Sequence, residues 1–180
     1  MSQTVTGMCR QTGKGPYRHV TALWKGAHAV AMGDATFIDS ITPDANSAGQ
    51  QYDKSAGDSV LFGAGTHSQA QVAFAAVFRG IADVRRTTLQ TSDGTDKTDG
   101  PIIATGEFTM PCSSLGSAAQ AGAYVGLAQG SGGAQTLNPQ QVEIVNSSAN
   151  AIGKLTEFAA VGSQYLTFDI TGFTVTGTDA

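Results

Sequence analysis

The residues of this sequence most able to do chemistry are three histidines and two cysteines. His19, His28 and His67 are scattered among glycines, alanines and serines, so no spacing brings them together as metal ligands or as a base beside a nucleophile. Cys9 and Cys112 are too few and too far apart for a metal cluster or a disulfide framework. We predict two free thiols and three histidines with surface or strand positions.

Other motifs also fall short of a site. Asp93, Asp96 and Asp99 are spaced by three residues, whereas a calcium loop needs ligands at alternating positions and a closing glutamate. Gly13-Lys14-Gly15 lacks the spacing and the following Ser/Thr of a phosphate loop, and Gly162-Ser163-Gln164 lacks the frame of a nucleophile elbow. We therefore predict no enzyme, and we expect no catalytic residue, no cofactor and no metal.

We predict that the regular secondary structure of this chain consists mainly of β-strands with a structural role. In residues 101–111, apolar and small side chains alternate with Thr105, Glu107 and Thr109, which is typical of a half-buried strand that ends at Pro111. The alternating residues of that first face are Ile102, Ala104, Gly106, Phe108 and Met110.

Two later segments repeat this plan. Val142 and Ile144 alternate with Gln141 and Glu143 after a turn signal at Asn138-Pro139. Near the end of the chain Leu166, Phe168 and Ile170 share a face. Gly172 then shifts the phase so that Phe173 and Val175 take inward positions, which predicts a β-bulge.

The longest apolar run is residues 69–91. Val72, Phe74 and Phe78 line one face, and small apolar residues make the other face nearly as apolar. A strand that is apolar on both faces is covered on both sides, so we predict a central barrel strand with these three residues at a subunit contact.

Short strands separated by frequent turn signals predict an all-β fold, a small β-barrel or sandwich with an extended N-terminal arm. We divide the chain into an arm (1–16), a strand-and-loop segment that continues the arm or forms a small β-subdomain (17–57), a barrel or sandwich body (58–176) and a polar tail (177–180). Within 17–57 we expect strands on either side of Gly26 and a long loop after Ile41, and we expect a short strand at 58–63.

Charge is distributed unevenly around a net value of −4. Residues 1–33 contain four basic residues and no acidic residue, and the rest of the chain has all 14 acidic residues. An acidic body does not fit a nucleic-acid binder of the basic-patch type. A basic arm favours docking on an acidic protein surface, because charge complementarity sets register and association rate. The predicted docking residues are Arg10, Lys14, Arg18, Trp24 and Lys25, with Trp24 also a candidate packing anchor.

Four short motifs together resemble the head decoration, or capsid cement, proteins of tailed bacteriophages. They are a Gly-x-Phe strand (Gly106, Phe108), the turn and strand Gly122 to Gly126, a Val-x-Ile-Val strand (Val142 to Val145), and Ala-Ile-Gly-Lys (Ala151 to Lys154). The resemblance covers roughly residues 58–170 and implies a small β-barrel on the outside of the head shell. It implies a homotrimer whose partner is the major capsid protein. The 55 or so residues ahead of it depart from the family pattern.

Two alternatives stay open. A carbohydrate- or receptor-binding β-sandwich of a virion or tail fibre would expose aromatic residues on one face. An enzyme would need an acidic pair such as Asp39 with Glu107. No segment has the roughly 20 consecutive apolar residues that span a bilayer, and the N-terminus lacks the apolar stretch of a secretory signal. We expect no membrane or nucleic-acid partner, and assembly onto a virion in the host cytoplasm.

Overall fold

The computed structural model describes residues 10–12, 16–25, 30–38, 53–57, 61–62, 65–83 and 97–175. Its helices are α1 (His67–Ala75) and the short 3₁₀ helix η1 (Ser148–Asn150). Its strands are β1 (Arg10–Gln11), β2 (Arg18–Lys25), β3 (Ala35–Ile38), β4 (Asp53–Ser55), β5 (Phe78–Ala82), β6 (Lys97–Thr105), β7 (Glu107–Pro111), β8 (Tyr124–Gln129), β9 (Leu137–Val145), β10 (Gly153–Leu155) and β11 (Tyr165–Asp169).

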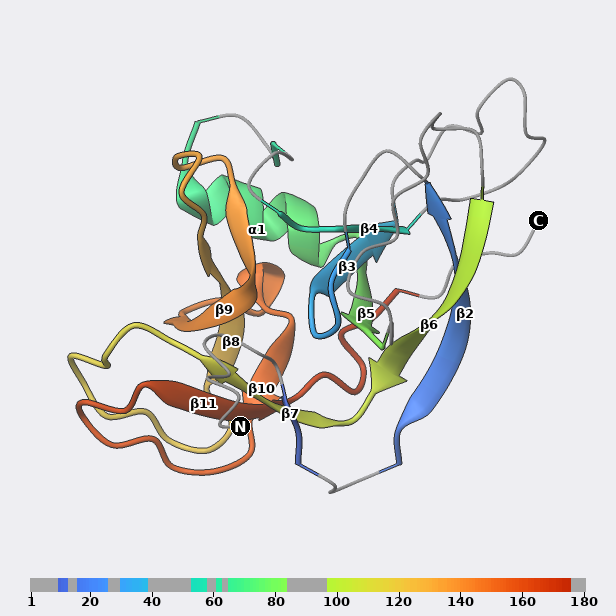
Figure 1. Cartoon of the computed structure of the whole chain (residues 1–180). Helices are drawn as coiled ribbons and strands as arrows, with labels where there is room; N and C mark the ends of the chain where they lie inside the picture. Colours follow the sequence, from blue (N-terminus) through green and yellow to red (C-terminus); the bar gives the residue numbers. More distant parts are fainter. Residues whose placement is uncertain are drawn as a thin grey trace, which may run out of the picture.

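The strands form two units, which confirms the all-β prediction (Figure 1). One is a closed barrel in the order β2-β4-β3-β5-β6, and the other is a six-stranded sheet in the order β1-β7-β11-β10-β8-β9. Strands on both sides of the predicted boundary at 57–58 contribute to the same barrel. Residue 177 onward, predicted as a tail, lies outside the described residues.

The barrel and the sheet are joined by one nearly continuous stretch of chain, β6 followed by β7. The chain bends between them at Gly106, where φ is +131°. The predicted alternation is confirmed here, because Ile102, Phe108 and Met110 are buried while Thr109 is half-buried. β7 ends at Pro111 as predicted. Glu107, predicted to face water, is instead 9% exposed at the bend.

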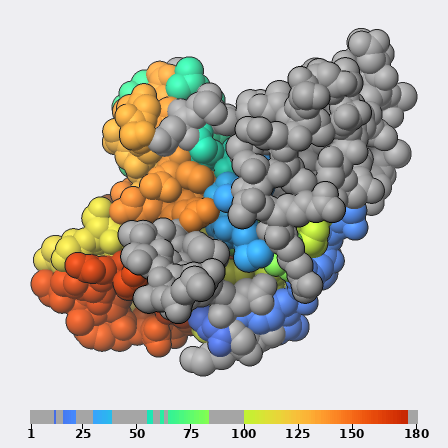
Figure 2. Space-filling view, viewed as in Figure 1, coloured from blue at the N-terminus to red at the C-terminus, as the bar shows by residue number. Residues whose placement is uncertain are grey.

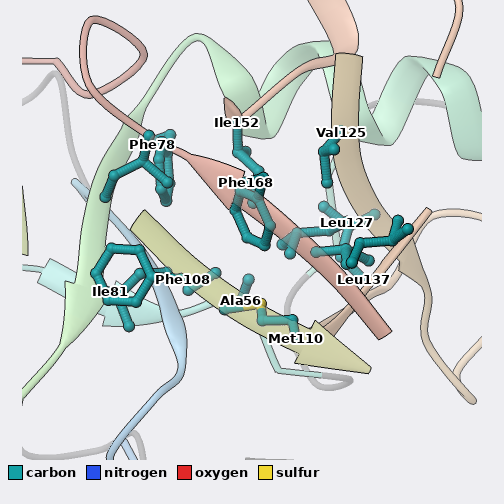
Figure 3. Close-up of a cluster of buried hydrophobic side chains, with 14 of the residues drawn as sticks. Ala56, Phe78, Ile81, Phe108, Met110, Val125, Leu127, Leu137, Ile152 and Phe168 are labelled. Atoms are coloured by element: carbon teal, nitrogen blue, oxygen red, sulfur yellow. The ribbon is translucent and has the colours of Figure 1, made fainter. Parts of the chain in front are cut away.

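One apolar core runs through both units (Figure 3). Phe78 and Ile81 from the barrel belong to the same buried cluster as Phe108 and Phe168 from the sheet. Leu166, Phe168 and Ile170 are all buried, which confirms their predicted shared face. The barrel and the sheet therefore fold as one body, since neither has a separate core of comparable size in the described residues.

The prediction of a strand for the long apolar run is wrong, because most of the first part of the run is helical. Residues 67–75 form α1, which begins with a capping box in which the Thr66 hydroxyl accepts from the Gln69 amide and the Gln69 side chain accepts from the Thr66 amide. The strand β5 starts only at Phe78. The turn then places Phe74 and Phe78 side by side, with ring centroids 5.7 Å apart.

Three smaller predictions also need correction. The expected bulge at Gly172 is a turn, in which the Phe173 amide donates to the Ile170 carbonyl, although Phe173 does pack against the core. The long loop after Ile41 contains strand β4. In the expected strand at 58–63, the described residues Leu61 and Phe62 have no strand structure. The expected break near Gly26 lies outside the described residues.

Candidate functional site

The predicted docking residues that the structure describes lie in two strands, β1 of the six-stranded sheet and β2 of the barrel. Arg10 lies in β1, where it pairs with Thr109 at the edge of the six-stranded sheet, and Arg18 is exposed at the start of β2. The backbones of Trp24 and Lys25 end β2 opposite Thr98 and Lys97, while their side chains are outside what the structure describes. Lys14 also lies outside the described residues.

Residues next to these basic positions anchor the N-terminal segment on the bend between β6 and β7. The Tyr17 hydroxyl donates to the Glu107 carbonyl at 2.9 Å, and the Tyr17 ring meets Phe108 edge to face at 5.9 Å. The Thr12 hydroxyl donates to a Glu107 carboxylate oxygen at 2.6 Å. Part of the predicted arm is thus an edge strand of the protein's own sheet, held by Thr12 and Tyr17.

The three residues predicted at a subunit contact do not form one surface. Phe74 and Phe78 are 1% and 0% exposed within the single chain, where they pack in an aromatic cluster with Phe37 and Phe62. Val72, at 41% exposed, stands on the outer side of α1. Burial inside the protein's own core removes Phe74 and Phe78 from any contact with a neighbour.

A different surface exposes large apolar side chains. The loop before β8 and the loop before β11 lie against each other and form what we call the loop platform, residues 113–123 and 156–164. Backbone hydrogen bonds join them, with Ala119 and Ala159 exchanging N–H···O bonds of 2.8 and 2.9 Å and Leu115 bonded to Gly162 and Ser163. Figure 2 shows these loops, in yellow and orange-red, at one corner of the molecule.

The loop platform presents Phe158 and Val161, which are 56% and 65% exposed, beside Tyr165 at the start of β11. Glu157 is its only charged residue. The sequence interpretation saw small-residue connections here and missed the surface. The one available signal was the pair of large apolar residues inside a segment rich in Ala, Gly and Ser.

Two of the histidines that the sequence left isolated, His19 and His67, each lie next to a carboxylate. His19 Nε2 lies 3.1 Å from Asp83 Oδ2 near the surface, and His67 Nε2 lies 2.8 Å from Glu143 Oε1. Gln71 Nε2 donates to the same Glu143 oxygen and to the Leu127 carbonyl, so this group fastens α1 to β8 and β9. His28 is outside the described residues.

The His67 group is better suited to holding the helix than to base catalysis. Its Nε2 is occupied by Glu143, and its Nδ1 is buried with no hydrogen-bond partner among the described residues. A general base must instead reach the proton that it removes. Within the described part of the chain, no three His, Cys, Asp or Glu side chains gather as a metal site, and no helix is long and apolar enough to cross a membrane.

Cys112 is a buried free thiol at the end of β7, and its Sγ donates to the Ser163 carbonyl at 3.5 Å. Burial raises the pKa of the thiol. Because the thiolate is the reactive form, a raised pKa lowers reactivity at neutral pH.

In a Cys9→Ser variant, we expect Cys112 to react with iodoacetamide at pH 7.5 at least about tenfold more slowly than glutathione does. The rate should keep rising as the pH passes above the ordinary thiol range. The same measurement in denaturant supplies the control, where the thiol should react at the rate of a free cysteine. A native thiol that matches glutathione would mean that the β7 end is open.

Comparison with protein-family models, characterised proteins and solved structures finds no significant match for this chain. The resemblance to decoration proteins therefore depends on its four motifs. The described structure places these motifs at the bend into β7, in β8, in β9 and across the start of β10, all of them around the six-stranded sheet.

Proposed function

We propose that this protein is a structural component of a virion that binds the outside of a phage capsid and stabilises the head shell, as a homotrimer assembled in the host cytoplasm. The observation that carries the proposal is the loop platform. It is an almost uncharged surface that exposes the large apolar side chains of Phe158 and Val161, and backbone hydrogen bonds hold it in one shape. Such patches on soluble proteins mark sites where another protein is bound.

The platform has the properties of an interface centre. Aromatic and apolar side chains at the centre of an interface contribute most of the binding free energy, and charged groups are depleted there. Phe158 and Val161 are exposed to solvent on loops whose backbones are already hydrogen-bonded to each other at Ala119 and Ala159. Little conformational entropy is then lost when the platform docks, which favours affinity.

The resemblance supports the same function from another direction. Its motifs come from separate parts of the sequence, yet Phe108, Val125 and Val142 lie in β7, β8 and β9 of the six-stranded sheet, and Ile152 directly precedes β10 of the same sheet. They therefore describe one structural unit, the six-stranded sheet, and the platform loops join the strands of that unit. A resemblance confined to unrelated loops would lack this coherence.

The basic N-terminal residues add an electrostatic component. Arg10 lies in an edge strand beside β7, the strand that leads into the platform, and Arg18 is exposed. Charges at the rim of an interface mainly raise the association rate and make it sensitive to salt. We infer that the arm guides the protein to acidic capsid residues while the platform supplies most of the affinity.

Stabilisation of the shell follows from mass action. A ligand that binds only the assembled lattice shifts the equilibrium toward assembly, by an amount set by its concentration relative to its dissociation constant. A head offers many equivalent sites, and a trimer can engage several of them at once, so a moderate affinity for each contact gives a large total effect.

The experiment is co-sedimentation of the purified protein with undecorated phage heads at low and high salt, with mass photometry of the free protein. We expect saturable binding that weakens moderately but persists at high salt, because screening removes the contribution of the arm and leaves the apolar contact. Free protein should appear as a trimer.

Bovine serum albumin at equal concentration is the control for trapping in the pellet. Absence of saturable binding to any head, with a stable monomer in solution, would overturn the proposal. Binding that high salt abolishes completely would contradict the role of the platform, since an apolar contact is insensitive to screening.

A further inference from the structure

A second surface feature lies between the barrel and the six-stranded sheet. It is a cleft of about 520 Å³, within the range of roughly 300–1,000 Å³ typical of small-ligand sites. Asp34 comes from the barrel side, Pro111 and Cys112 from the end of β7, and the remaining walls from β9 and the residues around the start of β11. The lining residues are Asp34, Pro111, Cys112, Ser114, Asn138, Pro139, Gln140, Gln141, Gln164 and Tyr165.

An irregularity in β9 places a run of amides in this cleft. Strand β9 pairs with β8 at Leu137 and again at Val142, opposite Gln129 and Leu127, so residues 138–141 of β9 stand opposite one residue of β8. A bulge of this kind redirects side chains and is frequent beside binding sites. Asn138 fixes the shape, since its Oδ1 accepts from the Gln140 amide and its Nδ2 donates to Gln141 Oε1.

Several polar groups of the cleft remain available. Among the described residues, no hydrogen bond engages the side-chain amide of Gln164, the Ser114 hydroxyl or the Tyr165 hydroxyl. Gln140 Oε1 likewise accepts no hydrogen bond from them. Tyr165 lines the cleft and is 56% exposed, so its aromatic side chain is accessible to a ligand there. Planar amides and hydroxyls that both donate and accept, next to an aromatic face, match the alternating hydroxyl and C–H surfaces of a sugar.

The charge of the cleft defines the ligand further. Among the described residues Asp34 is the only charged one that lines the cleft, and its carboxylate already accepts from the Gln140 side chain at 2.6 Å, the Ser55 hydroxyl at 2.8 Å and the Ala31 amide at 2.9 Å. No Lys, Arg or His in the described part of the chain lines the cleft to pair with an anion. An anionic ligand would meet the Asp34 charge without a compensating cation.

We propose that this cleft binds a neutral saccharide, with the Gln140 and Gln164 amides hydrogen-bonding hydroxyl groups and the Tyr165 ring packing against a sugar face. The cleft adjoins the loop platform, because Ser114 and Gln164 belong to both, but Phe158 and Val161 are not among the lining residues, so separate variants can test sugar binding and capsid docking. On a virion, such a site would hold the particle on glycan-covered surfaces.

The test is a titration of the ¹⁵N-labelled full chain with maltose, cellobiose, lactose and chitobiose, followed by two-dimensional NMR, with 3′-sialyllactose as the anionic comparison. We expect at least one neutral sugar to give saturable shifts at the amides of Ser114, Gln140 and Gln164, and the anionic sugar to bind at least about tenfold more weakly. Gln164→Ala and Tyr165→Ala should each weaken binding about five- to tenfold.

Gln129→Ala is the matched control, because Gln129 is an exposed glutamine of β8 outside the cleft lining. It should leave the dissociation constant unchanged. Absence of saturable shifts with all four neutral sugars would overturn the proposal, as would equal or tighter binding of 3′-sialyllactose. Loss of head binding by platform variants that keep sugar binding would separate the two functions.

Discussion

A Phe158→Asp/Val161→Asp double variant should lose affinity for undecorated heads by at least about a hundredfold while remaining folded. Both side chains are largely exposed, so their replacement removes little from the core of the free protein. In the complex each would be the kind of central apolar residue whose loss costs about 2 kcal/mol or more, and a buried unpaired carboxylate adds a desolvation penalty. Co-sedimentation isotherms measure the affinity, and thermal unfolding checks the fold.

The control for this variant is Leu61→Asp. Leu61 is 66% exposed, close to the 65% of Val161, but it does not belong to the loop platform. It should bind heads like the unmodified protein. Full head binding by the double variant would contradict the platform as the docking surface. If the double variant instead changed from a trimer to a monomer in mass photometry, the platform would be the subunit contact.

The strands of the second half of the chain could be predicted where one face of the strand is buried against the core and the other face is more exposed. In β7 and β11 one face packs on the core, so apolar residues such as Met110 and Phe168 recur with period two. In β9 the period is weaker, because Val142 is buried while Ile144 is only half-buried. The ends of strands could also be predicted where a residue restricts the backbone conformation, as Pro111 does at the end of β7.

The helix α1 could not be predicted from periodicity because its exposed face carries apolar residues as its buried face does. Ala70 and Phe74 are buried, whereas Val72 is 41% exposed. A run that is apolar on every face has neither a two-residue nor a 3.6-residue period, so a strand and a helix are alike in such a sequence. The distinguishing signal was local. Thr66 and Gln69 have the spacing of a capping box directly ahead of Ala70, and alanine favours helix.

The surfaces that carry the proposals could not be predicted because they combine distant segments. The loop platform requires residues 113–123 to meet 156–164, a pairing set by the order of β7, β11, β10 and β8 in the sheet. The cleft requires Asp34 to meet Gln140, 106 positions later. Neighbouring residues could indicate the amide-rich segment at 138–141, but not the wall opposite to it.

The chain bends at Gly106 between the barrel and the six-stranded sheet. Gly106→Ala should destabilise the protein by about 3 kcal/mol or more. The φ of +131° is one that residues with a Cβ rarely adopt, which costs on the order of 1–3 kcal/mol. A Cβ at this position would also lie 2.3 Å from Cδ1 of Tyr17, so the ring that anchors the N-terminal segment would have to move. Urea unfolding measures the loss of stability.

Two further substitutions separate these causes. Gly162 has a φ of +84° and no atom within 4 Å of an added Cβ, so Gly162→Ala reports strain without a clash and should cost about 1 kcal/mol. In a Tyr17→Ala background the clash is absent, and Gly106→Ala should cost clearly less than it does in the unmodified protein. Equal costs in both backgrounds would mean that Tyr17 does not pack on the bend.

Displacement of Tyr17 has a consequence that links the fold to docking. The Tyr17 hydroxyl bond to Glu107 and the Thr12 bond to the same residue hold the chain on either side of residues 13–15, so loss of the first should release β1 from β7. Limited trypsin digestion should then cleave after Arg10 and Arg18 faster in Gly106→Ala than in Gly162→Ala. The same variant should retain platform-mediated head binding at high salt and lose the salt-sensitive part, because only the basic edge strand has been freed.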